Sequence, residues 1–186
     1  MTNAPTSKTL SPGFRYATSA DVSAIVGLVE SAYRGAASRA GWTTEADLLA
    51  GRRTDAEEIG QLLAGSEGRF VLLEEGGELL ASCYIEKKGD ACYFGMFSVR
   101  PLRQGGGIGR RVVAEVERLA RQDWACSSVE MAVIDVRDEL MAWYGRRGYA
   151  RTGRFSPFPY GDERFGIPLR DDLRFEYVVK PLGGEA

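Results

Sequence analysis

The sequence contains no histidine and only three cysteines, and these two shortages exclude several common catalytic chemistries. Without histidine, neither a Ser-His-Asp nor a Cys-His site can form, and most zinc sites lose a preferred ligand. Cys83, Cys92 and Cys126 are odd in number, widely spaced and free of any C-x-x-C pair. We therefore expect no metal site and no disulfide framework, and interpret the cysteines as small core residues.

The sequence also lacks a long apolar run and a strong excess of charge. No segment approaches the roughly 20 apolar residues of a membrane-spanning helix, and the polar N-terminus is unlike a secretion signal. The net charge of −2, from 24 basic and 26 acidic residues, favours neither nucleic acid nor an anionic membrane as a partner. We therefore expect a cytoplasmic protein that binds neither.

The length of 186 residues and the hydrophobic content of 44% suit one domain. We predict a flexible N-terminal segment over residues 1–10 and a single domain over residues 11–186.

The apolar periodicities predict a mixed α/β (α+β) fold, with a sheet of six to seven strands and helices on both faces. Strands are expected near residues 13–17, 69–75, 78–88, 91–99, 127–135, 149–153 and 173–179. The strand, helix and strand between residues 91 and 135 predict a parallel crossover.

Four helical segments are expected between and around these strands. One begins at Val22 after a Thr18–Asp21 capping box, and a second covers residues 43–64 with a break near Gly51 and a second capping box at Thr54 and Glu57. The others begin at Ile108 and at Glu139. Residues 154–172 show no periodicity and are predicted to be an irregular loop, which is more often functional than idle.

Glycines at positions 105, 106 and 107 lie directly before the helix that begins at Ile108, and Gly109 is its second residue. A glycine inside a helix costs about 0.5–1 kcal/mol relative to alanine, so these glycines indicate a demand on the backbone itself. Successive N–H groups at a helix start bind phosphate, and Arg103, Arg110 and Arg111 flank the loop. Neither the Walker pattern nor the dinucleotide pattern fits.

The pattern V-x-P-x-x-[QR]-x-x-G-x-[GA], matched by Val99, Pro101, Gln104, Gly107 and Gly109, resembles the acyl-CoA signature of the GNAT N-acetyltransferase superfamily. The resemblance implies the GNAT acyl-CoA N-acyltransferase fold and acetyl-CoA as cosubstrate. It implies that the loop holds the coenzyme pyrophosphate through Gln104, Gly105, Gly106, Gly107, Ile108, Gly109 and Arg110. It also implies that the preceding strand, at Phe97, Ser98 and Val99, binds the pantetheine arm and polarises the thioester.

Ala142, Tyr144, Gly148 and Tyr149 resemble a further segment of that family, whose tyrosine often protonates the departing thiolate. Tyr144 is therefore the expected general acid, since the phenol pKa of about 10 suits this proton transfer. The alternative is that Tyr144 only packs its helix beside Trp143. Where the family frequently carries an asparagine before this tyrosine, the chain has Arg137, which could contact a coenzyme phosphate or form a surface salt bridge.

An acceptor amine attacks only in its neutral form, so a base is expected, and Glu130 is the predicted one. Glu86 is the other carboxylate on a predicted strand. Either Glu130 or Glu86 could instead lie exposed on its strand or form an ion pair that serves only the structure.

The resemblance implies an acceptor pocket built from residues 33–55 and 154–172, with Tyr33, Trp42 and Tyr160 as substrate-binding residues. The second segment mixes aromatic rings and carboxylates with Arg154, Arg164 and Arg170. The aromatic and acidic side chains could bind an ammonium group, and the arginines could bind a carboxylate or merely neutralise the acids. The segment could also pack over the sheet or form a dimer contact.

The predicted function is transfer of an acetyl group from acetyl-CoA to the primary amine of a small molecule, by direct attack in a ternary complex. Two alternatives stay open: a non-catalytic acyl-CoA-binding sensor, and a protein N-acetyltransferase acting on lysine or an N-terminus. The segments "GWTTEADLL" and "FGIPLRDDLRFEYVVKPL" resemble a bacterial group of the same family, and family habit makes a homodimer plausible.

Overall fold

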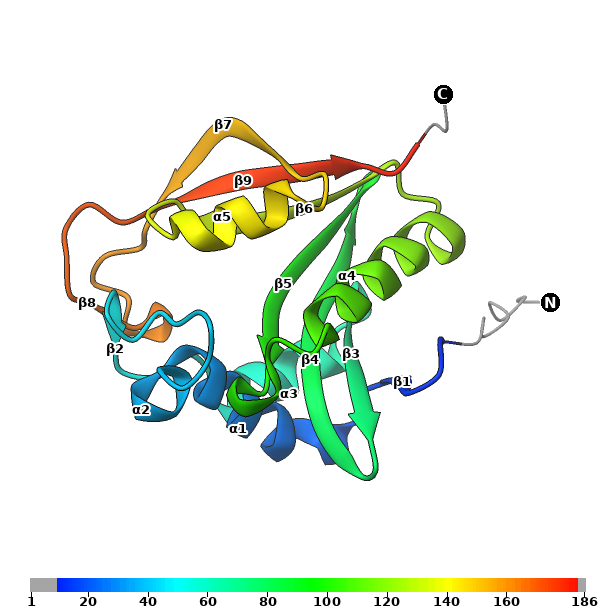
Figure 1. Cartoon of the computed structure of the whole chain (residues 1–186), viewed down its shortest axis with the longest axis horizontal. Coiled ribbons are helices and arrows are strands. Elements are labelled where there is room, and N and C mark those ends of the chain that lie inside the picture. The colour runs from blue at the N-terminus through cyan, green and yellow to red at the C-terminus, as the bar shows by residue number, and fades with distance from the viewer. Residues whose placement is uncertain (1–9, 184–186) are drawn as a thin grey trace.

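The computed structural model describes residues 10–183, and a seven-stranded mixed sheet runs through them in the order β1-β3-β4-β5-β6-β9-β7 (Figure 1). The predicted flexible segment lies outside the described residues except for Leu10. The strands of this sheet are β1 (Phe14–Tyr16), β3 (Gly68–Glu75), β4 (Glu78–Lys88), β5 (Ala91–Val99), β6 (Ser128–Ile134), β7 (Ala150–Pro157) and β9 (Arg174–Pro181). The helices are α1 (Val22–Tyr33), α2 (Gly35–Ser38), α3 (Ala56–Ala64), α4 (Ile108–Arg118) and α5 (Asp138–Gly145).

The strand pairing follows the turn chemistry of the sequence. Strands β3, β4 and β5 form the predicted antiparallel meander, and Gly76 and Gly77, both with positive φ, make its first turn. Strand β5 then continues through α4 into β6, which lies parallel to β5, so the predicted crossover is confirmed.

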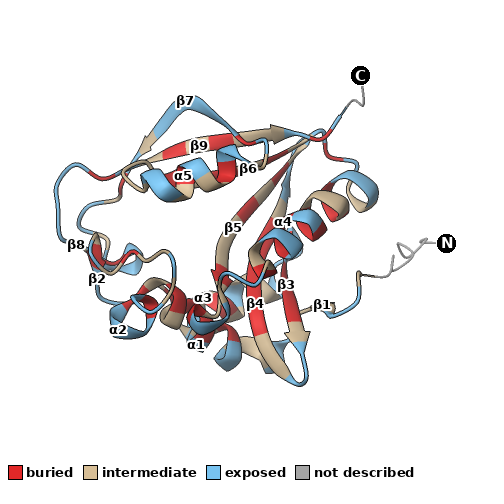
Figure 2. Cartoon of the chain, viewed as in Figure 1, coloured by how far each residue is buried: buried red, intermediate tan, exposed pale blue. Residues whose placement is uncertain are grey.

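Helices cover both faces of the sheet, as the periodicity predicts. Along β3 the side chains alternate: Phe70 and Leu72 pack under α1 and α3, whereas Val71 and Leu73 face the core beneath α4. Figure 2 shows the buried residues along the central strands and on the inner sides of the helices. Burying each large aliphatic side chain contributes about 1.5–3 kcal/mol to folding. Cys83, Cys92 and Cys126 are free thiols buried in the α4 core, which confirms their interpretation as core residues.

Strands β5 and β6 pair over only three positions, Ala91 to Tyr93, and then diverge (Figure 1). Within the same strand, a bulge places Met96 and Phe97 opposite the single residue Cys83 of β4. Met96 has a φ of 45°, a value that non-glycine residues adopt only when the surrounding structure holds them there. The second half of β5 therefore has an edge with no strand beside it.

The prediction of a helix over residues 43–50 is wrong. These residues form turns and the short strand β2 (Leu49–Ala50), which pairs with β8 (Ile167–Pro168). Side chains supply the bonds that a helix would have made: the hydroxyl of Thr44 accepts from the N–H of Ala46 at 3.0 Å and contacts the hydroxyl of Ser38 at 2.6 Å. Such local bonds compete with the helical ladder.

Two boundaries also differ from the prediction by small steps. The first capping box is confirmed, since the carboxylate of Asp21 accepts from the N–H of Thr18 at 2.7 Å. The second is shifted by one residue, because Asp55 rather than Thr54 caps α3 and accepts from the N–H of Glu58 at 2.9 Å. The irregular loop begins later than predicted, since β7 extends to Pro157.

Over residues 10–183, no helix combines the length and the apolar character that a membrane crossing requires. The same residues contain no group of three or more His, Cys, Asp or Glu side chains arranged to hold a metal ion.

Candidate active site

Two cavities meet where β5 and β6 diverge. The larger has a volume of about 580 Å³ and extends from β5 past the glycine loop, and the smaller has a volume of about 240 Å³ and lies between β5, β6 and the 158–175 region. Both are lined by Tyr33, Phe97, Arg137, Leu140 and Tyr144. The two cavities therefore adjoin at these five residues, which form a shared wall.

The glycine loop forms one end of the larger cavity. Gly105 and Gly107 have φ values of 89° and 83°, and Gly107 is the N-cap of α4 without any side-chain cap. Within the described chain, no protein acceptor binds the backbone N–H groups of residues 105–107, and the first helical bond there joins the N–H of Arg111 to the carbonyl of Gly107. These donors at a helix start form an anion site. Gly106 and Ile108 do not line the cavity themselves.

Gln104 fixes the base of the loop. Its side-chain amide donates to the carbonyl of Val99 at 3.1 Å, and its side-chain oxygen accepts from the N–H of Trp42 at 2.6 Å. A Cβ atom on Gly41 would lie 2.8 Å from that oxygen, so only glycine permits this contact. Gln104 thus connects the end of β5 to the segment that follows α2, and its side chain is already engaged by protein groups.

Three arginines without an acidic partner lie beside the loop. Arg110, Arg146 and Arg147 line the larger cavity, and in the described part of the chain none has a carboxylate within ion-pair distance. Arg147 stacks on Trp143 at 3.4 Å from the ring centroid. Burial lowers the pKa of Arg147, and the charges of Arg146 and Arg110 lower it further. This region therefore favours an anionic ligand.

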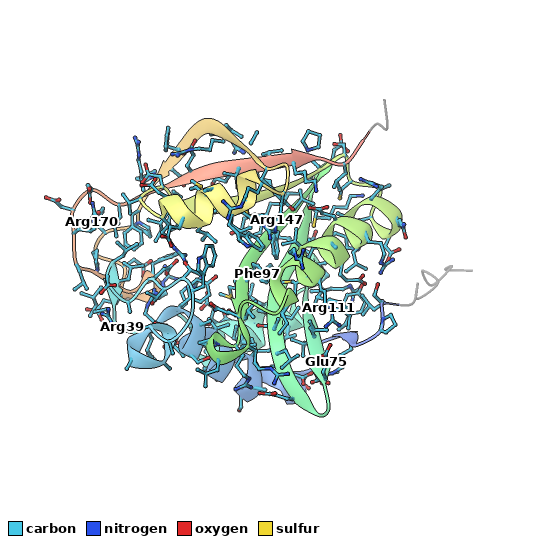
Figure 3. The ribbon with its side chains drawn as sticks, in the orientation of Figure 1. Arg39, Glu75, Phe97, Arg111, Arg147 and Arg170 are labelled. Carbon is cyan, nitrogen blue, oxygen red and sulfur yellow. The ribbon has the colours of Figure 1, made fainter. Side chains whose placement is uncertain are left out.

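Two of the arginines predicted to flank the loop contact acidic groups of the β3–β4 turn instead. Arg111 forms an ion pair with Glu75, and Figure 3 shows these two side chains together, away from Phe97 and Arg147. Arg103 lies 4.0 Å from Glu78. The prediction that they flank an anion site is wrong for Arg111, whose charge is neutralised there.

Aromatic rings form the wall between the loop and the shared residues. The centroid of Trp143 lies 6.3 Å from that of Trp42 and 6.5 Å from that of Phe97. A Cβ atom on Gly109 would lie 3.3 Å from the Trp143 ring, so glycine lets the first turn of α4 approach α5 closely. Trp42, predicted to bind substrate, lines only the larger cavity.

Tyr144 is buried with 5% of its surface exposed, yet it lines both cavities. No hydrogen-bond partner for its hydroxyl group lies among residues 10–183. Burial, and then the neighbouring Tyr33, raises the pKa of Tyr144, so the phenol keeps its proton. In contrast, the adjacent Tyr149 donates its hydroxyl to Glu117 at 3.1 Å and lines neither cavity.

A buried ion network borders the smaller cavity. Glu45 accepts from Arg34 at 2.8 Å through one carboxylate oxygen and from Arg137 at 2.8 Å through the other. Burial alone would raise the pKa of Glu45, but Arg137 and Arg34 lower it below its usual range. Arg137 also donates to the hydroxyl of Thr43 at 2.8 Å, so its guanidinium joins α5 to the 43–45 segment and does not reach the glycine loop.

The segments predicted to form the acceptor pocket meet over the smaller cavity. Strand β2 pairs with β8, and the N–H of Leu169 donates to the carbonyl of Leu48 at 2.9 Å. Phe158 and Phe165 line the cavity from this side. The segment's three arginines bind acids, since Arg164 pairs with Asp162, Arg170 with Asp172 and Arg154 with Glu130. Of the predicted alternatives, mutual neutralisation is the one observed.

Several predicted site residues lie outside both cavities. Glu130 pairs with Arg154, and Glu86 lies 3.6 Å from Lys88, and neither carboxylate lines a cavity. The hydroxyl of Tyr160 accepts from the N–H of Leu173 at 2.7 Å and braces the loop. Ser98 is buried, and its hydroxyl donates to the carbonyl of Met96 at 3.3 Å.

The residues that the sequence did not reveal are mostly cationic. They are Arg146 and Arg147 beside the glycine loop, and Arg34, Glu45 and Arg53 at the smaller cavity. The pair Arg146-Arg147 between Gly145 and Gly148 was a usable signal, since it follows a helix that ends near the predicted phosphate site. Arg34, Glu45 and Arg53 lie in the predicted acceptor segment 33–55, but no local motif distinguishes them from its other charged residues.

Comparison with known proteins gives matches over this same region. The profile of the Acetyltransferase (GNAT) family matches residues 30–149. No curated protein sequence is similar enough to be identified as a relative.

Solved structures resemble the fold over most of the chain. A ribosomal-protein-alanine N-acetyltransferase from Brucella melitensis is 18% identical, with 90% of this chain and 98% of that chain covered and a TM-score of 0.66. The structure of yncA from Salmonella typhimurium with its cofactor acetyl-CoA is 18% identical, with 96% and 97% covered and a TM-score of 0.62. A spermidine N-acetyltransferase chimera of Vibrio cholerae and hSSAT is 12% identical, with 91% and 94% covered and a TM-score of 0.65. At these identities the likeness establishes the fold, and the mixed seven-stranded sheet agrees with it.

Proposed function

Because this chain belongs to the GNAT acetyltransferase family, we propose that it transfers the acetyl group of acetyl-CoA to the primary amine of a small molecule. One observation carries the proposal: the cavity that begins at the glycine loop and the smaller cavity share a wall at Tyr144 and Phe97. Two substrates bound in these cavities would place their reacting groups against the same residues, which suits direct attack in a ternary complex.

The coenzyme side of the proposed reaction uses the larger cavity. The free N–H groups of the glycine loop would hold the pyrophosphate, and Arg110, Arg146 and Arg147 would add positive charge beside it. The unpaired edge of β5 near Phe97 and Val99 would lie along the pantetheine arm. The bound cosubstrate supplies an activated thioester.

In the proposed transfer, the neutral amine forms a bond to the thioester carbonyl carbon and the carbon–sulfur bond breaks. Tyr144 would protonate the departing sulfur, the surplus proton of the amine would pass to water, and the Tyr144 phenolate would take a proton back from water. The place of Tyr144 in the wall of both cavities and its hydroxyl without a protein partner in the described chain support this role. Burial raises the pKa of its phenol, so Tyr144 carries the proton before the transfer. Glu130 is no longer our candidate base, because Arg154 neutralises it outside both cavities.

The shape of the acceptor side favours a small molecule over a protein. The smaller cavity of about 240 Å³ is bordered by Leu49 of β2, which pairs with β8, and by Phe158 and Phe165. Among the similar structures, one protein is named for a ribosomal-protein alanine and another for spermidine, so the family fold serves both kinds of acceptor. The cytoplasmic location and the homodimer stay predictions from the sequence.

The test compares two neighbouring tyrosines in an acetyl-CoA turnover assay with a panel of small amines. We expect Tyr144→Phe to lower kcat by about 10²- to 10⁴-fold, the usual contribution of a proton transfer, and to leave acetyl-CoA binding intact. Tyr149→Phe is the matched control, since its hydroxyl binds Glu117, and it should retain kcat. Tight acetyl-CoA binding without turnover in the wild type would instead support a sensor, and acetylation of lysate proteins alone would support a protein acetyltransferase.

A further inference from the structure

The smaller cavity carries an excess of positive charge. Its charged lining residues are Arg34, Arg53, Arg137 and Glu45, which is three guanidinium groups against one carboxylate. Both oxygens of Glu45 are already bound, one to Arg34 and one to Arg137. Among the lining residues, no carboxylate is left to receive a second cationic group of an acceptor.

Arg53 is the cation of this lining that Glu45 does not bind directly. In the described chain, its guanidinium has no carboxylate within ion-pair distance, whereas its neighbour Arg52 lies 3.9 Å from Asp55. The backbone of Arg53 is fixed, because its N–H donates to the carboxylate of Glu30 at 2.6 Å. The guanidinium carbon lies 5.5 Å from the centroid of Tyr33, a residue of the shared wall. Arg53 is therefore held beside the cavity with its charge unpaired.

Arg34 provides a second observation that the smaller cavity carries excess positive charge. It is buried with 6% of its surface exposed, and two of its nitrogens, Nε and Nη2, have no hydrogen-bond partner. A buried guanidinium with unused donors is costly unless an anion is near, and Glu45 alone serves both Arg34 and Arg137. The single carboxylate of Glu45 thus leaves the lining of the cavity with an excess of positive charge.

From these contacts we infer that the acceptor amine carries a carboxylate, and that Arg53 binds this carboxylate. This inference rests on the proposed function and names its acceptor class. A guanidinium matches a carboxylate through two parallel hydrogen bonds, so it can orient the molecule as well as attract it. With the carboxylate at Arg53, the amine would lie in the cavity that Phe97 and Tyr144 of the shared wall also line.

The rest of the cavity specifies the uncharged part of the acceptor. Aromatic side chains surround it, including Tyr93, Phe94, Phe158, Phe175 and Tyr177. Together with the volume of about 240 Å³, they fit a compact apolar or aromatic group. The acceptor class is therefore a small amino acid-like molecule with an apolar side chain. A polyamine is disfavoured, because its second ammonium would lie in a cavity whose lining has three guanidinium groups and one carboxylate, with Arg53 unpaired.

The experiment measures binding, so that it does not depend on knowing the natural acceptor. Protein saturated with coenzyme A is titrated calorimetrically with 3-phenylpropanoate and, separately, with 3-phenylpropanamide, which has the same shape without the charge. We expect the acid to bind at least about tenfold more tightly, as a charge-assisted bidentate contact implies. Arg53→Gln should remove this preference, and Arg52→Gln, which changes an exposed neighbouring arginine, should keep it.

Equal affinity for the two compounds, or binding of neither, would overturn the inference, and so would an unchanged preference in Arg53→Gln. The same titration begins with coenzyme A, so it separates the two claims. If coenzyme A fails to bind, the proposed function fails first. If coenzyme A binds and the acid shows no advantage, the acceptor inference alone is wrong.

Discussion

The hydroxyl group of Tyr33 donates a 2.9 Å hydrogen bond to the backbone carbonyl of Phe97. This contact joins the last residue of α1 to the bulge in β5, and both residues line both cavities. Burial raises the pKa of Tyr33 to about 12, so the hydroxyl stays protonated and can keep donating. The shape of the shared wall thus depends on a bond between elements that are distant in sequence.

Tyr33→Phe should lower the free energy of unfolding by about 1 kcal/mol, because it leaves the Phe97 carbonyl without its donor. Urea denaturation measures the change. Tyr16→Phe is the matched control, since the Tyr16 hydroxyl has no hydrogen-bond partner in the described chain and its loss should cost less. Equal effects of the two substitutions would show that the Tyr33 bond contributes little.

Two helical glycines should respond to alanine with opposite signs. Gly27 in α1 has open space where a Cβ would lie, so Gly27→Ala should raise the free energy of unfolding by about 0.5–1 kcal/mol. At Gly109 the new Cβ would lie 3.3 Å from the Trp143 ring, and the overpacking cost of about 1–3 kcal/mol should exceed that gain. Thermal or urea unfolding of both variants decides this, and stabilisation by Gly109→Ala would disprove the close packing of α4 on α5.

Glu45→Gln should destabilise the fold by about 3–5 kcal/mol at neutral pH, because it leaves Arg34 and Arg137 without their shared carboxylate. The pKa of Glu45 in the folded protein is lowered, so its contribution is present above the unfolded pKa of about 4.3 and is lost as the pH falls through the folded pKa. The difference in unfolding free energy between wild type and Glu45→Gln should therefore shrink below about pH 4. A pH-independent difference would mean that Glu45 is not ionised in the fold.

The pH dependence of acetyl transfer should follow the acceptor and not the protein. Neither cavity is lined by a carboxylate free to act as a base, so the amine must arrive neutral. Values of kcat/KM should rise up to the pKa of the amine, near about 8 for the α-amine of a peptide and about 10 for a lysine-like amine. Glu130→Gln should leave both profiles unchanged. If the pH profile of kcat/KM in the wild type showed an ionisation near neutral pH, and Glu130→Gln removed it, Glu130 would be the base.

Much of the fold was predictable from the sequence because it depends on local signals. Apolar strands separated by the turn residues Gly76-Gly77 and Gly89-Asp90 predict the β3–β5 meander, and Ile108, Val112 and Val116 mark the buried face of α4. The helix predicted over residues 43–50 failed for non-local reasons in addition to the local bonds of Thr44. Arg34 and Arg137 hold Glu45, and Leu49 packs with Ile134 and Phe158, and no window of neighbouring residues contains these partners.

The candidate site likewise contains residues that the sequence predicted and residues that it could not predict. The glycine loop and Tyr144 belong to motifs with fixed spacing, and the structure brings them to one cavity. Glu130 was chosen as a strand carboxylate, but its pairing with Arg154 depends on the register of β7 and β9, which the sequence does not specify. Arg53 could not be found because its significance lies in the absence of a nearby carboxylate within the described fold, which is a property of the tertiary structure.

The most direct test of the account is thermal unfolding of the purified chain with acetyl-CoA, coenzyme A, ATP and NAD side by side, since it needs no acceptor. A ligand present at 100 times its dissociation constant adds about 2.7 kcal/mol of stability, which is about 5–11 °C for a chain of this size. We predict such a shift with acetyl-CoA and coenzyme A only. A shift with ATP or NAD instead, or no shift with any of the four, would contradict the assignment of the glycine loop and the larger cavity to coenzyme A.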